Sequence, residues 1–162
     1  MYAHELPPRS DSARQIPQEV LRSAAVLAAA ILAVPHEGPN SACIQHKKTL
    51  LARLYSFITD ANGKYSAPYR SQGVINAIEN GEEVIVEHEH VHSRISVTRL
   101  LLEDPSRVED VLSTRLIACL VTQEEHRALT KAEKEHGVEG WERYRAASVV
   151  VPGITETLRS GA

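Results

Sequence analysis

The chain has 162 residues, a formal charge of −3 at pH 7, and 43% hydrophobic but only 4% aromatic residues. A chain of this length suits one domain and can bury about 70% of the surface that its unfolded form exposes. The two cysteines form no Cys-X-X-Cys pair, which excludes a cysteine-based zinc knuckle, and a disulfide scaffold is not expected. We therefore expect a cytoplasmic protein with an aliphatic core.

The N-terminal third predicts an arm followed by a buried helix. Residues 1–16 are polar and contain prolines, so we expect a flexible arm there. A helix is predicted from Pro17 to just before Pro35, through the apolar residues 24–34. That stretch is too short for a membrane span, which needs about 20 residues, so no membrane partner is expected. Because alanines let helices approach closely, a homodimer is a further expectation.

Residues 17–82 predict a helical segment. Ser41 is a candidate cap for a second helix, which should end at Asn62-Gly63. Residues 64–70 read as a loop, and residues 71–79 as a short helix.

Basic residues are concentrated in the first half of the chain. Residues 1–70 carry eight Lys or Arg and five Asp or Glu, whereas residues 71–162 carry ten and sixteen. A basic patch in the first half would meet the phosphates of nucleic acid, and its candidate contacts are Lys47, Lys48 and Arg70. The alternative interpretation is a solvated helix face.

Three histidines alternate within residues 83–92, a predicted strand. The two-residue period puts His88, His90 and His92 on one face and the interleaved Glu89 on the other. Imidazoles this close can bind a metal together, or one can bind while another acts as a base. At a strand end or bulge, adjacent residues can also turn toward one site. The alternative is an edge strand whose charges prevent aggregation.

A second strand and a capped helix follow. Asp104-Pro105 opens a helix, and residues 116–121 then predict a short strand. Residues 122–125 form the capping box Thr-Gln-Glu-Glu, so a helix begins there and should stop near Gly137. His126 lies in or just after its first turn. A strand pair followed by a helix can place a strand histidine and a helix histidine around one cation.

Two runs resemble HNH endonucleases. Glu89-His90-Val91-His92-Ser93-Arg94 is similar to the acid-His-aliphatic opening of that family, and residues 120–127 are similar to its second strand and helix with the terminal histidine. The resemblance covers roughly residues 84–129 and implies a ββα-metal fold, a hairpin and helix around one divalent ion. The expected organisation is a flexible arm (1–16), a helical segment (17–82), an HNH-like region with a C-terminal helix (83–151) and a tail (152–162).

The resemblance implies a role for each matched residue. His90 would be the general base that activates water. Glu89 and His126 would be the metal ligands, from the strand and the helix. Carboxylate and imidazole do not choose among Mg²⁺, Mn²⁺, Ni²⁺ and Zn²⁺, so the identity of the ion stays open.

Further residues of the matched runs complete the expected site. Arg94 would contact a phosphate, and His88 and His92 would support the site from behind or face the DNA. The family's bracing asparagine is absent, because Ala118-Cys119 stands at its place.

The sequence thus predicts an α+β, mostly helical single domain with a ββα-metal core. The leading functional hypothesis is a metal-dependent endonuclease that hydrolyses phosphodiester bonds of DNA. One alternative is a metal- or nucleic-acid-binding module without catalysis, which the missing asparagine favours. Another is a helical interaction protein that dimerises.

Overall fold

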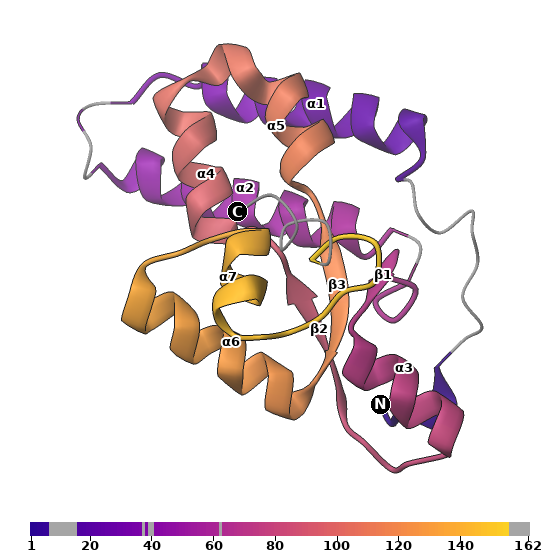
Figure 1. Ribbon diagram of the computed structural model, residues 1–162. Coiled ribbons are helices and arrows are strands. Elements are labelled where there is room, and N and C mark those ends of the chain that lie inside the picture. Colours follow the sequence, from indigo (N-terminus) through magenta and orange to yellow (C-terminus); the bar gives the residue numbers. More distant parts are fainter. Residues whose placement is uncertain (7–15, 37, 39–40, 62, 156–162) are drawn as a thin grey trace.

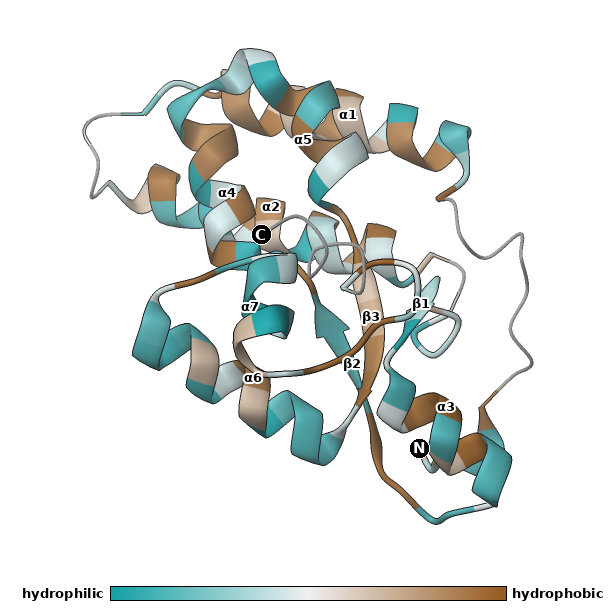
Figure 2. Cartoon of the chain, in the orientation of Figure 1, coloured by the Kyte–Doolittle hydropathy of each residue, from teal (hydrophilic) through white to brown (hydrophobic). Residues whose placement is uncertain are grey.

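Strand β3 (Ala118–Thr122) is the centre of a small three-stranded sheet, and all five of its residues are buried. It pairs in parallel with β1 (Tyr69–Arg70) and antiparallel with β2 (Val86–His90), so the strand order is β1-β3-β2. The computed structural model describes residues 1–6, 16–36, 38, 41–61 and 63–155. They form a mixed α and β fold in which helices predominate (Figure 1), and apolar residues run along β3 (Figure 2).

Four helices form a layer of their own beside the sheet and share one apolar core. They are α1 (Gln18–Ala33), α2 (Ala42–Thr59), α4 (Arg94–Glu103) and α5 (Val108–Arg115). Ala24 and Ala28 of α1 are buried in this core, and their small side chains let α1 pack closely on α2 and α5. The apolar N-terminal stretch is a helix, as predicted, but it is not a buried one: Val26 and Leu27 are more than half exposed, so α1 packs on this core by one face only.

Tyr55 fixes this helical layer to the sheet. Its ring is buried, and its hydroxyl lies 2.9 Å from the carbonyl oxygen of His92 and 3.2 Å from that of Arg115. These two carbonyls follow β2 and precede β3, so one side chain of α2 ties down both strands at the same end. Burial raises the pKa of Tyr55 above its usual value, which keeps the hydroxyl a donor.

Helices α6 (Gln123–His136) and α7 (Trp141–Ala146) pack against each other, and α6 packs on both β2 and β3. Leu129 and Tyr144 join Val121 in the core beneath them. A third cluster holds α3 (Gln72–Asn80) and the 3₁₀ turn η1 (Ala3–Glu5), and a second 3₁₀ turn, η3 (Pro105–Arg107), connects α4 to α5. The sheet thus lies between α6 on one face and α3 with η1 on the other, and α2 contacts it at the His90 end of β2.

The predicted helix starts and stops are confirmed. The Ser41 hydroxyl accepts a hydrogen bond from Ile44 N at the start of α2. Thr122 and Glu125 form the expected capping box of α6, which ends at Gly137 with φ of 64°. The side-chain oxygens of Ser41 and Thr122 satisfy amide groups that have no partner inside the helix.

Several boundaries differ from the prediction. The expected strand over residues 83–92 is the shorter β2, because Ser93 caps α4 and ends the extended chain soon after His90. Strand β1 lies in residues 64–70, a segment that reads as a loop. Two helices, α4 and α5, separate β2 from β3, so the pair is not a tight hairpin.

The first six residues belong to the fold, although the composition predicts a flexible arm over residues 1–16. Ala3 N donates to Val84 O at 2.9 Å, Val86 N donates to Met1 O at 3.0 Å, and Ala3 is buried. Backbone pairing here outweighs the polarity of the segment. Residues 7–15 and 156–162 lie outside the described residues, whereas Thr155 in the predicted tail is buried. None of the described helices is both long and apolar enough to span a membrane.

Thr122→Ala tests the cap that positions α6. The substitution removes the hydroxyl that accepts from Glu125 N at 3.1 Å, so we expect the free energy of unfolding to fall by about 1 kcal/mol. Urea unfolding followed by circular dichroism measures it. The matched control is Thr130→Ala, whose hydroxyl donates only within α6 and whose loss should change stability by less than about 0.5 kcal/mol. Equal losses in both variants would contradict the capping role.

Candidate functional site

Glu89 and His126 come together between β2 and α6. Glu89 is buried on the face of β2 that α6 covers, and its Oε2 lies 2.7 Å from Nδ1 of His126. The sequence predicted that these two side chains meet although they are far apart in the chain. The structure places them in direct contact.

His126 faces outward from this contact. It sits in the first turn of α6, directly after the capping box, and its side chain is 43% exposed. When the neutral ring donates Nδ1–H to Glu89, the lone pair on Nε2 is the free one. No hydrogen bond to Nε2 is formed by any of the described residues. The arrangement therefore presents an oriented imidazole nitrogen to solvent.

Arg143 holds the other oxygen of Glu89. Its side chain on α7 is buried, and Nη2 donates to Glu89 Oε1 at 2.5 Å and to the His90 carbonyl oxygen at 2.8 Å. Nη1 donates to Glu133 Oε2 at 2.7 Å. Burial opposes the charge, but Glu89 and Glu133 more than compensate and hold the pKa of Arg143 above its usual value.

Sequence reasoning missed Arg143. A C-terminal helix was predicted within residues 83–151, but nothing in the local sequence distinguishes Arg143 from the exposed Arg145 two residues later. A buried glutamate needs a partner, and that requirement is the only signal that could have prompted a search for a cation in this part of the chain.

His90 points to the opposite face of β2, so the expected convergence of Glu89, His90 and His126 is only partly met. Its Nε2 lies 3.2 Å from Thr59 Oγ1, and its ring centroid is 4.9 Å from that of Tyr55. Burial, together with the charges of His88 and Arg94, lowers the pKa of His90 to about 4. It is therefore neutral at pH 7 and a weaker base than an ordinary histidine.

His88 and His92 do not support the Glu89–His126 pair either. His88 Nε2 faces Asp60 Oδ1 at 3.4 Å, on the α2 side of the sheet. Nδ1 of His92 lies 3.3 Å from a guanidinium nitrogen of Arg115, and burial lowers the pKa of His92 to about 4. A Cβ at Gly140, which has φ of 63°, would lie 2.8 Å from His92 Cε1, so His92 helps to fix the glycine that begins α7.

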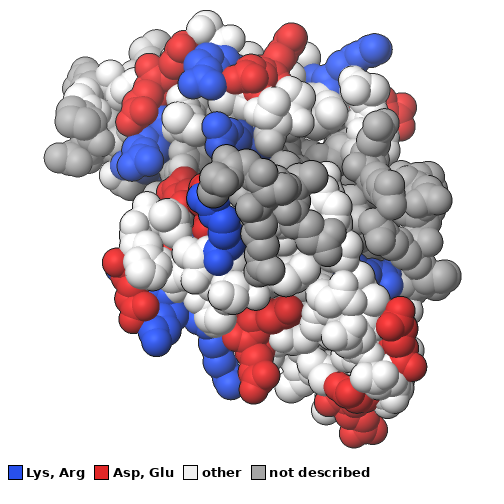
Figure 3. Space-filling model, in the orientation of Figure 1, with Lys and Arg blue, Asp and Glu red and all other residues white. Residues whose placement is uncertain are grey.

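The predicted basic patch is not one continuous surface. Lys47 is buried, and its Nζ donates to Leu32 O at 2.8 Å. Arg70 is also buried, whereas Lys48 and Arg94 are exposed on α2 and α4. Because the side chains of Lys47 and Arg70 are buried, they are not available to bind the phosphates of nucleic acid. On the face shown in Figure 3, acidic and basic side chains are interspersed.

The position of the family's asparagine lies inside β3. Ala118 and Cys119 are both buried, and Cys119 is paired in register with Glu89. Burial raises the pKa of the Cys119 thiol above its usual value, so it is neither a thiolate ligand nor a nucleophile.

The donor set suits part of a metal site. A carboxylate oxygen and an imidazole nitrogen are ordinary ligands for divalent cations, and both belong to one contact here. Among the described residues, no group of three or more His, Cys, Asp or Glu could hold a metal ion. For both to bind one ion, His126 would coordinate through Nδ1 in place of its hydrogen bond to Glu89, and water and substrate would supply the remaining ligands. Arg143 opposes a second positive charge, and this lowers the expected affinity.

Arg143→Met tests the buried ion pair. It leaves the Glu89 carboxylate without its buried cation, so we expect a loss of about 3–5 kcal/mol in the free energy of unfolding. The control is Arg145→Met on the same helix, whose exposed ion pair with Glu142 should contribute less than about 1 kcal/mol. Adding Glu89→Gln to Arg143→Met should recover part of the loss. Similar stabilities for the two arginine variants would contradict the assignment.

His90 should make stability depend on pH. Its pKa is about 4 in the folded state and about 6.5 when unfolded, so the unfolded state binds more protons between these values. Stability is therefore complete above pH 6.5 and falls toward pH 4. From pH 7 to pH 5 the wild type should lose about 1 kcal/mol more than His90→Gln, after allowing for partial exposure. His136→Gln, at an exposed histidine, should behave as wild type does in urea unfolding, and an unchanged slope in His90→Gln would refute the prediction.

Comparisons with protein-family models, with curated proteins and with solved structures gave no match to this chain.

Proposed function

We propose that this chain is a metal-dependent phosphodiesterase that acts on nucleic acid, in the manner of an HNH endonuclease, with DNA as the first substrate to test. Glu89 and His126 would hold its one divalent ion. The observation that carries the proposal is the 2.7 Å contact between a buried strand carboxylate and a half-exposed helix imidazole. A carboxylate that fixes the ring of a half-exposed histidine is common at metal and catalytic sites.

The side chains around the pair keep it ready to bind. Arg143 fixes one oxygen of Glu89, so the other stays aimed at His126. The capping box fixes the start of α6 and with it the direction of the His126 ring. When bound, a divalent ion would supply positive charge for the developing charge on the scissile phosphate. Arg127 follows His126 and is exposed. Among the described residues its guanidinium has one hydrogen bond, to the Gln123 amide oxygen at 2.8 Å, so its charge is available to a substrate phosphate.

The proposed base remains His90, by resemblance to the family. Its ring lies on the face of β2 opposite Glu89 and His126, so it is directed away from the proposed ion. Its lowered pKa makes it a weaker base. A substitution at His90 therefore separates the role that the family resemblance implies from the role that its contacts support, which is packing against Tyr55 and Thr59.

A second candidate is a metal- or nucleic-acid-binding module without catalysis. The direction of His90 favours it, and so do the buried, non-amide side chains of Ala118 and Cys119 at the asparagine position. Such a module would retain the Glu89–His126 contact and bind an ion or a phosphate without cleaving the chain.

A homodimer remains a prediction as well. Val26 and Leu27 of α1 and Phe57 of α2 are large apolar residues that are more than half exposed. Exposed apolar residues of this size are typical of protein interfaces, so sedimentation of the protein used for the cleavage assays should show a dimer if these side chains are covered.

Cleavage assays test the proposal. Supercoiled plasmid and single-stranded DNA and RNA are incubated with Mg²⁺, Mn²⁺, Ni²⁺ or Zn²⁺, or with EDTA. We expect metal-dependent nicking by the wild type and a loss of at least about 100-fold in His126→Ala and in Glu89→Gln, which corresponds to about 2.7 kcal/mol of barrier. The matched control is His136→Ala at the exposed end of α6, which should cleave as wild type does.

The remaining outcomes separate the candidates. Loss of cleavage in a folded His90→Ala variant would support its role as base, whereas full activity would restrict it to packing. Metal binding that depends on His126 without cleavage in any ion would favour the binding module. Cleavage by His126→Ala at the wild-type rate would refute the proposed site. Circular dichroism of Glu89→Gln checks that the protein still folds when Arg143 keeps its contacts with Glu133 and the His90 carbonyl oxygen but loses the Glu89 charge.

A further inference from the structure

A groove of about 530 Å³ lies between α2 and α4, and it shares no lining residue with the Glu89–His126 pair. Its walls are largely apolar, with Ile44 and Ala52 on α2 and Ile95 and Leu102 on α4. Ile95 is 82% exposed, so an apolar surface is left open to water at the edge of the groove. The volume and the apolar lining are those of sites that bind small molecules.

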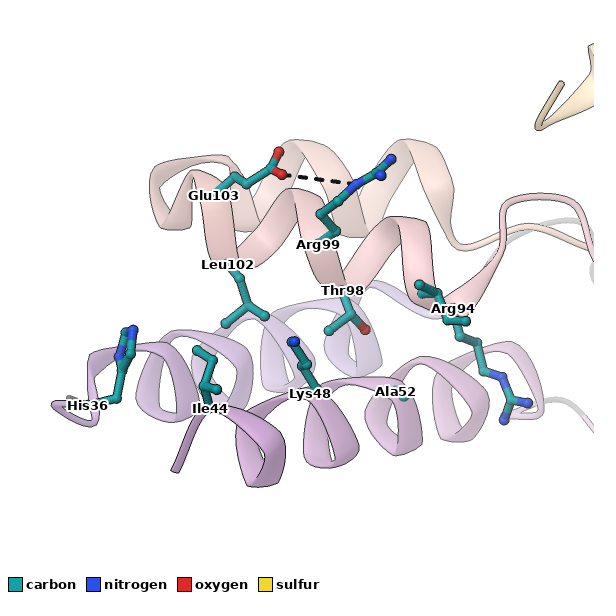
Figure 4. Close-up of a pocket in the computed structure, with 10 residues that line it drawn as sticks. His36, Ile44, Lys48, Ala52, Arg94, Thr98, Arg99, Leu102 and Glu103 are labelled. Atoms are coloured by element: carbon teal, nitrogen blue, oxygen red, sulfur yellow. Dashed lines mark ion pairs between the residues drawn. The ribbon is translucent and has the colours of Figure 1, made fainter. Parts of the chain in front are cut away.

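Two polar groups point into this apolar groove from opposite walls. Lys48 rises from α2 between Ile44 and Ala52, and Thr98 points down from α4 (Figure 4). Thr98 is only 5% exposed, yet its hydroxyl forms no hydrogen bond with any of the described residues, whereas other helical threonines bond to their own helix. Its oxygen is not fully enclosed and faces the groove that Thr98 lines, so a ligand atom there can accept its hydrogen.

The charges around the groove favour an anion. Lys48 has no carboxylate within ion-pair distance in the described part of the chain, whereas Glu103, the acid among the lining residues, faces Arg99 at 4.0 Å. Arg94 extends along α2 at one end and donates to Ser56 Oγ at 3.2 Å, a neutral acceptor that leaves its charge uncompensated. Figure 4 shows the Arg99–Glu103 pair on the side of α4 that faces away from α2, although both residues line the groove.

We propose that this groove binds a small organic anion with an apolar body. Its carboxylate or phosphate head would accept hydrogen bonds from Lys48 Nζ and Thr98 Oγ1, and its body would lie on Ile44, Ala52 and Leu102. A nucleic acid does not suit this surface, because its bases and sugars would leave the apolar walls poorly covered. Lys48 is thus assigned to this ligand, and the phosphodiesterase site does not require it.

Calorimetric titration of the full chain tests the proposal with three probes of equal chain length: decanoate, decyl phosphate and decanol, all below their micelle-forming concentrations. At least one of the two anions should bind in a one-to-one ratio and about tenfold more tightly than decanol, since a charge-assisted hydrogen bond is lost in the alcohol. Which anion binds more tightly identifies the head group.

Three variants locate the site. Lys48→Gln and Thr98→Val, which keep side-chain size, should each weaken anion binding by about tenfold and leave decanol binding unchanged. Ala52→Phe fills the groove and should weaken all three probes. Lys134→Gln, at an exposed lysine of α6, is the control and should bind as wild type does.

The proposal is overturned if decanol binds as tightly as both anions, if Lys48→Gln and Lys134→Gln behave alike, or if Ala52→Phe binds normally. Self-association that Ala52→Phe abolishes, without anion binding, would instead assign the groove to a second copy of the chain. Plasmid cleavage by Thr98→Val at the wild-type rate shows that the groove and the phosphodiesterase site are tested independently.

Discussion

The buried ion pair between Arg143 and Glu89 is the interaction on which the rest of the candidate site depends. A carboxylate enclosed between a strand and two helices is expensive unless a cation and further donors satisfy it. Arg143 does this with one guanidinium, which also reaches Glu133 on α6 and the carbonyl oxygen of His90 on β2. One side chain of α7 thereby fixes the distance between β2 and α6. The position of His126 relative to Glu89 follows from that distance.

The two-residue period of β2 separates two groups of polar side chains that are adjacent in sequence. Glu89 joins His126 and Arg143 on one face, while His88 and His90 contact α2 on the other. Because helices cover both faces of β2, neither face is fully exposed to solvent, and the polar atoms on both faces need partners inside the protein. The histidines on the α2 side are neutral packing groups with lowered pKa values, and the half-exposed histidine on the α6 side keeps a free nitrogen.

The features that depend only on residues close together in the chain were predicted from the sequence. Ser41, Thr122 and Gly137 begin or end helices as their types require, and the alternation of residues 86–90 correctly separates Glu89 from His90. The contact between Glu89 and His126 was predicted through resemblance to a family. What depends on the tertiary fold was not predicted: Arg143 is one of two similar arginines, and Lys47 and Arg70 are buried although their sequence context is basic and polar. Charge counted along a chain does not say which side chains reach solvent.

The insertion of α4 and α5 between β2 and β3 has a consequence for the order of folding. Strands joined by a tight turn can pair early, because closing a short loop costs little chain entropy. Here β2 and β3 are separated by residues 91–117. Formation of α4 and α5 within this segment shortens the distance between the ends of the two strands before they pair. Tyr55, whose hydroxyl contacts the chain just after β2 and just before β3, marks where that closure occurs. The central strand pair is therefore expected to form late, after α2, α4 and α5 have docked, and the contact between Glu89 and His126 would be among the last to appear.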